Sequence, residues 1–110
     1  MPVVYKVLGQ SCPAANTDTN IYTVPAATNA IVSTLAVCNL NTSVPATYRV
    51  AVRPGGAALA NQHYISYEFN APAADGPRET IGMTLNAGDV VTVRSSSGTV
   101  SFNLFGSEIS

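Results

Sequence analysis

Apolar and polar residues alternate with a period of two along most of the chain, in short runs rich in β-branched and aromatic residues. This alternation predicts β-strands, because successive side chains of a strand point to opposite faces of a sheet. Pro, Gly, Asn and Asp cluster between the runs and predict turns. The predicted strands cover residues 3–9, 21–24, 29–40, 46–54, 62–69, 78–86, 90–94 and a last run that begins at residue 100.

About eight short strands without a convincing helix predict an all-β fold. Such strands bury their apolar faces in an antiparallel β-sandwich or jelly-roll-like barrel. A length of 110 residues suits one domain, so we expect a single β-sandwich domain over residues 1–110. The polar loop at residues 10–20 leaves two options open for residues 1–20. They either belong to this domain or form an N-terminal arm that pairs with the edge of a neighbouring subunit.

The alternation also predicts which side chains face the core. The run 29–40 is apolar enough on both faces for a buried, central strand. One face carries Ile31, Ser33, Leu35 and Val37, and the other carries Val32, Thr34, Ala36 and Cys38. The inward sets of three other strands are Tyr48, Val50 and Val52; His63, Ile65, Tyr67 and Phe69; and Val100, Phe102 and Leu104. The outward sets are Arg49 and Arg53 on one strand and Tyr64, Ser66 and Glu68 on the next.

Charge is sparse along the chain. Charged residues make up 10% of it, against about 25% in an average soluble domain, and the net charge is −1. Nucleic acids and anionic membranes bind clustered Lys and Arg, so neither is an expected partner. No apolar run is as long as a membrane span and the N-terminus lacks an export signal, so we expect a soluble chain that is not exported by its own signal. Sparse charge gives little protection against association, and it suits a surface partly covered by neighbours.

Residues suited to catalysis or metal binding are few and scattered. His63 is the only histidine and no serine lies in a G-x-S-x-G turn, so Ser–His hydrolase chemistry is not expected. Cys12 and Cys38 lack the paired spacing of zinc ligands, and we expect two small hydrophobes in or near the core rather than a disulfide. The loop "NTDTN" at residues 16–20 has too few carboxylates for calcium. We therefore expect no enzyme activity, no cofactor and no metal site.

Polar and aromatic residues near the strand surfaces form the candidate interface. Arg49 and Arg53 lie four apart on one strand, with Glu68 on the next, so they either form a cross-strand ion pair or reach a neighbouring subunit. The tyrosines favour packing in the core and at interfaces, with a sugar-stacking platform as the alternative. The candidate interface residues are Tyr5, Lys6, Arg49, Arg53, Tyr64, Glu68 and Arg78.

A set of strand and turn strings runs over nearly the whole chain: "YTVPA", "VCN", "YRVAVRP", "AGDVVTV" and "FGSEI". With these strings the chain resembles a family of small virion proteins of tailed bacteriophages. The resemblance implies a β-sandwich carried on the virion, either decorating the capsid or forming part of the tail or its fibres. It brings no catalytic residues.

The resemblance leads to an expected function. We expect a non-enzymatic virion structural protein, a capsid decoration (cement) subunit that stabilises the assembled particle through subunit interfaces. The expected partners are the major capsid protein or other virion proteins and copies of this chain, with a homotrimer favoured. The expected location is the virion, assembled in the host cytoplasm. Two alternatives stay open: a tail, baseplate or fibre component, and a glycan-binding β-sandwich module.

Overall fold

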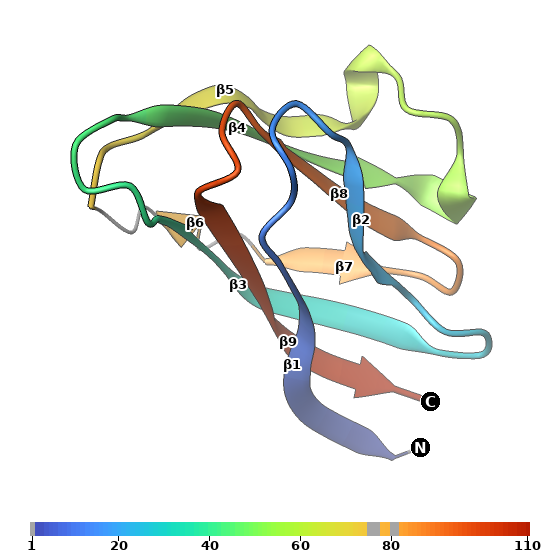
Figure 1. The fold of residues 1–110 in the computed structure, drawn as a ribbon. Coiled ribbons are helices and arrows are strands. Elements are labelled where there is room, and N and C mark those ends of the chain that lie inside the picture. The colour runs from blue at the N-terminus through green and yellow to red at the C-terminus, as the bar shows by residue number, and fades with distance from the viewer. Residues whose placement is uncertain (1, 75–77, 80–81) are drawn as a thin grey trace.

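The computed structural model describes residues 2–74, 78–79 and 82–110. Within these ranges the chain forms nine strands and two single turns of 3₁₀-helix (Figure 1). The strands are β1 (Val3–Ser11), β2 (Thr19–Thr23), β3 (Asn29–Asn39), β4 (Ala46–Arg53), β5 (Tyr64–Ala71), β6 (Arg78–Glu79), β7 (Met83–Leu85), β8 (Val90–Ser95) and β9 (Val100–Ile109). The 3₁₀ turns η1 (Pro54–Gly56) and η2 (Asn61–His63) both lie between β4 and β5.

Two antiparallel sheets pack face to face. Sheet A has the order β1-β9-β3, followed by β6 and β7, and sheet B has the order β2-β8-β4-β5. Because β6 and β7 pair with separate parts of β3, at residues 35–36 and 30–32, they share one position and sheet A is four strands wide. With that position shared, the strand order is that of the eight-stranded jelly roll. The predicted all-β antiparallel sandwich is confirmed, and so is the central place of β3.

The core lies between the sheets and consists of side chains that alternate inward. Tyr48 is fully buried, and its ring meets that of Phe102 edge to face with a centroid distance of 5.9 Å. Val100 and Leu104 share the inward face of β9 with Phe102, as predicted. Regular alternation therefore places the aromatic centre of the core correctly.

Asn39 is the polar residue buried at one end of this core, with 1% of its surface exposed. Its amide nitrogen donates to the carbonyl oxygens of Val44 and Ala71, both at 3.1 Å. Its side-chain oxygen accepts from the backbone N–H of Asn41 and from the hydroxyl of Thr99, both at 3.0 Å. Since both donors and both lone pairs of the amide are used, burial leaves no polar atom of Asn39 unsatisfied. The bonds link the loop after β3 to the end of β5 and to the turn before β9.

A β-bulge in β3 changes which of its residues face the core. The pairing with β9 shifts between Val32 and Thr34, so Ser33 is the extra residue. The prediction that Ile31 and Ser33 share one face with Leu35 and Val37 was wrong for this reason, and Ile31 is 45% exposed. Gly106 lies opposite the bulge, where a Cβ would stand 2.0 Å from the carbonyl oxygen of Ile31. The inward residues of β3 are Ala30, Val32, Leu35, Val37 and Asn39.

A second bulge lies in β5. Its pairing with β4 passes from Phe69 directly to Ser66, so Tyr67 and Glu68 stand opposite the single residue Arg49. Glu68 has a φ of 53°, in the left-handed region that few non-glycine residues adopt. This backbone kink shifts the alternation of the strand by one residue.

The bulge overturns the predicted faces of β5. Ser66, predicted outward, is buried, whereas Ile65 and Tyr67, predicted inward, are 42% and 59% exposed. Phe69 lies on its predicted side: it pairs with the buried Tyr48 and its ring meets that of Tyr48 edge to face at 5.7 Å, although 54% of Phe69 is exposed. The prediction was wrong for Ile65, Ser66 and Tyr67, because a period of two carries no signal for an inserted residue. The pairing with β4 shifts again between Val50 and Ala51, where Ile65 is the extra residue.

β1 extends further than predicted and pairs with β9 from Val3, opposite Ile109, to Ser11. It therefore lies in the sheet of its own chain. The two ends of the described chain also meet, since the backbone N–H of Ser110 donates to the carbonyl oxygen of Pro2 at 3.2 Å. Figure 1 shows both ends at the same end of the sandwich.

Two other expectations differ in detail. Both cysteines are free, and Cys12 is exposed, so the expected place in or near the core was wrong for Cys12. The predicted strand at residues 78–86 is divided into β6 and β7, with residues 80–81 outside the described ranges.

Candidate interaction surfaces

The predicted interface residues are divided between the two sheets. Tyr5 and Lys6 lie on β1 of sheet A. Arg49, Arg53, Tyr64 and Glu68 lie on β4 and β5 of sheet B. The backbone of Arg78 pairs with β3, and its side chain lies outside the described part of the chain. The residues do not form one site, so each sheet has to be considered by itself.

The outer face of sheet A carries exposed apolar side chains. Paired residues of neighbouring strands point to the same side, which places Tyr5, Ile31 and Thr84 in one row across β1, β9, β3 and β7. We define the sheet A face as Val3, Tyr5, Val7, Ile31 and Phe105, which are between 36% and 84% exposed. None of the described side chains that point to this side is charged.

The β1 edge borders this face. Among the described strands, β1 pairs with β9 alone, so its other edge is open. Val3 to Val7 pair with β9 without interruption, and the bulge in β1 comes only after Val7. The other outer strands of the sandwich are short, or bulged like β5. An open edge of β-branched and aromatic residues presents backbone donors and acceptors that favour pairing with another chain.

Lys6, predicted at the interface, belongs to a hydrogen-bonded cluster at the end of the sandwich. Its Nζ lies 3.1 Å from Oε1 of Glu108, and the Tyr22 hydroxyl donates to Oε2 of Glu108 at 2.5 Å. The bond from Tyr22 lowers the pKa of Glu108, and Lys6 acts in the same direction. Burial, followed by the Glu108 carboxylate, raises the pKa of Tyr22. The cluster joins β1 and β9 of sheet A to β2 of sheet B.

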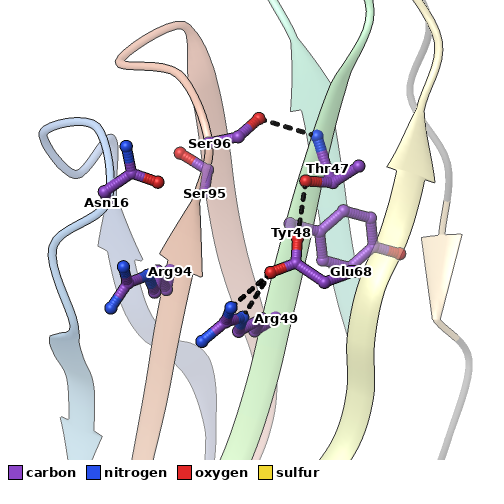
Figure 2. Close-up of a pocket in the computed structure, with 8 residues that line it drawn as sticks. All are labelled: Asn16, Thr47, Tyr48, Arg49, Glu68, Arg94, Ser95 and Ser96. Atoms are coloured by element: carbon purple, nitrogen blue, oxygen red, sulfur yellow. Dashed lines mark hydrogen bonds and ion pairs between the residues drawn. The ribbon is translucent and has the colours of Figure 1, made fainter.

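On sheet B, Arg49 and Glu68 form a cross-strand ion pair, which is one of the two alternatives that the sequence left open. Arg49 Nε lies 2.7 Å from Glu68 Oε1, and the Thr47 hydroxyl donates to Glu68 Oε2 at 2.7 Å. Figure 2 shows these three side chains pointing toward one another across β4 and β5. The Thr47 hydroxyl, followed by Arg49, lowers the pKa of Glu68. The left-handed backbone conformation of Glu68 thus directs its carboxylate toward β4.

Arg94 on β8 stands directly opposite Arg49. Two like charges in this position repel, and each is offset by an acid. Arg49 pairs with Glu68, and Nη1 of Arg94 lies 3.7 Å from Oδ1 of Asp18. Ser96 completes the polar cleft in Figure 2 by accepting the backbone N–H of Thr47 at 3.0 Å. This surface therefore carries paired charge and offers no isolated cation.

Two tyrosines lie beside the ion pair. The rings of Tyr64 and Tyr67 meet at 84° with a centroid distance of 4.9 Å, and the Arg49 guanidinium lies 4.3 Å from the centroid of Tyr67. With Asn61 of η2 they line a hollow of about 350 Å³. Tyr48 and Tyr22 are buried instead, so the tyrosines do not form one platform.

Arg53 bonds within its own chain. Its guanidinium donates to Thr92 Oγ1 at 3.1 Å, to Asn20 Oδ1 at 2.9 Å and to the carbonyl oxygen of Ala57 at 3.0 Å. These bonds fasten the loop after η1 to β8 and β2. Arg53 thus differs from Arg49, which contacts Glu68 and Tyr67 on the neighbouring strand β5.

His63 lies in a structural contact. It is buried, and its Nδ1 accepts the backbone N–H of Ala60 at 3.0 Å, which closes η2. No group of three or more His, Cys, Asp or Glu side chains suited to a metal is found in the ranges that the structure describes. Nor does any described helix have the length and apolar character needed to cross a membrane.

Sequence reasoning missed most of the sheet A face and the part played by Asn61. One signal was present in "VVYKV", residues 3–7, whose apolar residues fall on both sides of the strand. Such a run fits a strand buried on both faces or an edge strand that contacts a partner, and only the pairing order distinguishes them. Nothing in the sequence indicated that Asn61 would line the hollow.

Comparison with protein-family models gives no match for this chain, and comparison with curated proteins gives none either.

Proposed function

We propose that this chain is a non-enzymatic structural protein of a virion, a capsid decoration (cement) subunit that associates through the sheet A face and the β1 edge. The observation that carries the proposal is the accumulation of exposed apolar residues on β1. Val3, Val4, Tyr5 and Val7 are all 46% exposed or more, on a strand with an open edge. Exposed apolar surface beside an unpaired edge favours an intermolecular contact.

The chemistry of this surface suits a permanent contact. Tyr5 is a large amphipathic anchor of the type that dominates binding energy at interfaces. The described side chains of the sheet A face carry no charge to be desolvated, so association there avoids a major electrostatic cost. A cement protein binds the assembled lattice and not its separate parts, so such binding stabilises the particle by mass action.

The resemblance to small virion proteins of tailed bacteriophages supports the same proposal. Jelly rolls occur in viral capsids and also in lectins, so the fold is compatible with the proposal without selecting it. We include a homotrimer in the proposal. In a ring of three copies the contacts are heterologous, so the β1 edge of one copy meets a different surface of the next.

The test begins with purified virions that carry the protein. Quantitative mass spectrometry should find it in hundreds of copies, comparable to the number of capsid lattice sites. Absence of the protein from the particle would refute the proposal, and a few copies per particle would replace it by the tail, baseplate or fibre alternative.

A variant then tests the surface. Tyr5→Ser should leave the unfolding midpoint unchanged, because Tyr5 is 84% exposed, and should weaken binding to particles that lack the protein by about tenfold or more. Tyr67→Ser, on sheet B, is the matched control and should bind like the parent. Equal binding by the Tyr5→Ser variant and the parent would show that the contact lies elsewhere.

A further inference from the structure

The hollow lined by Asn61, Tyr64 and Tyr67 lies on sheet B, apart from the surface assigned to particle binding. Its volume of about 350 Å³ falls at the lower end of the range of roughly 300–1,000 Å³ seen for small-ligand sites. Tyr67 is 59% exposed, so a large part of its surface is available to a ligand.

The two rings are held in position before any ligand arrives. Tyr64 and Tyr67 pack edge to face, and the Arg49 guanidinium stacks against Tyr67. Arg49 is in turn fixed by Glu68, whose second oxygen accepts the Thr47 hydroxyl. A preorganised aromatic pair loses little side-chain entropy on binding.

The chemistry of the lining suits a neutral, hydroxylated ring. An aromatic face packs against the C–H face of a sugar, and the Asn61 amide supplies two donors and an acceptor for neighbouring hydroxyl groups. No hydrogen bond within the described chain engages the Asn61 side chain. The nearby arginines are paired with Glu68 and Asp18, which disfavours a phosphate-bearing ligand.

We propose that this hollow binds a saccharide, with a pyranose ring packed against Tyr67 and Tyr64 and its hydroxyl groups bonded to Asn61. Arg49, Glu68 and Thr47 are positioning residues that hold the rings. This inference goes beyond the structural role proposed above. The two surfaces lie on different sheets, so one protein can fasten to the particle by sheet A and present the hollow on sheet B.

The test uses the full chain and defined probes. Binding is measured on an array of neutral and acidic oligosaccharides. It is also measured by saturation-transfer NMR with methyl α-D-glucopyranoside, methyl β-D-galactopyranoside and N-acetylglucosamine. We expect saturable binding of at least one saccharide and an affinity about tenfold lower for Tyr67→Ala, as the loss of an aromatic contact implies. Asn61→Ala should lower the affinity in the same direction.

Tyr5→Ala is the matched control, since it removes an exposed tyrosine from the other sheet and should bind the saccharide like the parent. Far-UV circular dichroism checks that every variant is folded. Absence of saturable saccharide binding overturns the proposal, as does unchanged binding by Tyr67→Ala. Saturable binding of a proline-rich peptide or a nucleotide instead would overturn the assigned ligand class. The copy number in virions is unaffected by any of these outcomes, so the two proposals fail separately.

Discussion

The bond from Tyr22 to Glu108 offers the sharpest test of the energetics of the sandwich. Tyr22→Phe removes the hydroxyl and keeps the ring, which is only 8% exposed. A hydrogen bond to a charged group contributes about 1.5–3 kcal/mol. The Glu108 side chain is 15% exposed and retains Lys6, so we expect a loss of about 1–2 kcal/mol in the free energy of unfolding at pH 7.

The loss should depend on pH in a defined direction. The folded-state pKa of Glu108 is lowered, so its contribution is present above the unfolded value of about 4.3 and is lost as the pH falls through the folded value. The difference between the parent and Tyr22→Phe should therefore be largest near neutrality and should shrink in acid. The folded-state pKa of Tyr22 is raised, so above about pH 10 the parent should lose stability more steeply than the variant.

Urea unfolding followed by far-UV circular dichroism measures this difference as a shift in midpoint at constant slope. Tyr5→Phe is the control, because Tyr5 is 84% exposed. Loss of its hydroxyl should change the free energy of unfolding by less than about 0.5 kcal/mol. Equal midpoints for the two variants at pH 7 would refute the reasoning. A difference that stays constant down to pH 3 would show that the bond does not depend on the ionised carboxylate.

Two further substitutions test the backbone and the buried amide, each by thermal or urea unfolding. Gly106→Ala should cost about 3 kcal/mol or more, because its Cβ would stand 2.0 Å from a carbonyl oxygen of β3. Gly98→Ala, whose Cβ would meet nothing closer than 3.9 Å, should be nearly neutral, and equal losses would contradict the close approach. Asn39→Ala should cost about 2–4 kcal/mol, because it leaves several buried partners unsatisfied, and a loss below about 1 kcal/mol would mean that water replaces the amide.

The regular strands could be predicted from the sequence, and the bulged ones could not. Val100, Phe102 and Leu104 alternate along an uninterrupted stretch of β9, so their inward direction followed from a period of two. In β3 one inserted residue, and in β5 two shifts of register, interrupt the alternation and change which side chains face the core. Neither Ser33 nor Glu68 is a residue type that indicates a bulge in the sequence. Glu68 also adopts a positive φ, which glutamate rarely does.

The candidate surfaces show the same division. The pairing of Arg49 with Glu68 could be anticipated as one of two outcomes, because both residues were placed outward on consecutive strands. The cluster of Tyr64 and Tyr67 could not, because Tyr67 was assigned to the core. The exposure of Val3 to Val7 depends on β1 being an outer strand, which is a property of the whole topology and not of the local pattern.

The meeting of Ser110 with Pro2 has a practical consequence for protein engineering. Because the start of β1 lies beside the end of β9, a short linker could close the chain into a ring. New ends could then be opened in the exposed turn at residues 96–98 without breaking a strand. Such a circular permutant would carry its tags beside the β8–β9 turn and leave the β1–β9 ends unencumbered. A protein fused to the new ends would then lie away from the start of β1 and the end of β9.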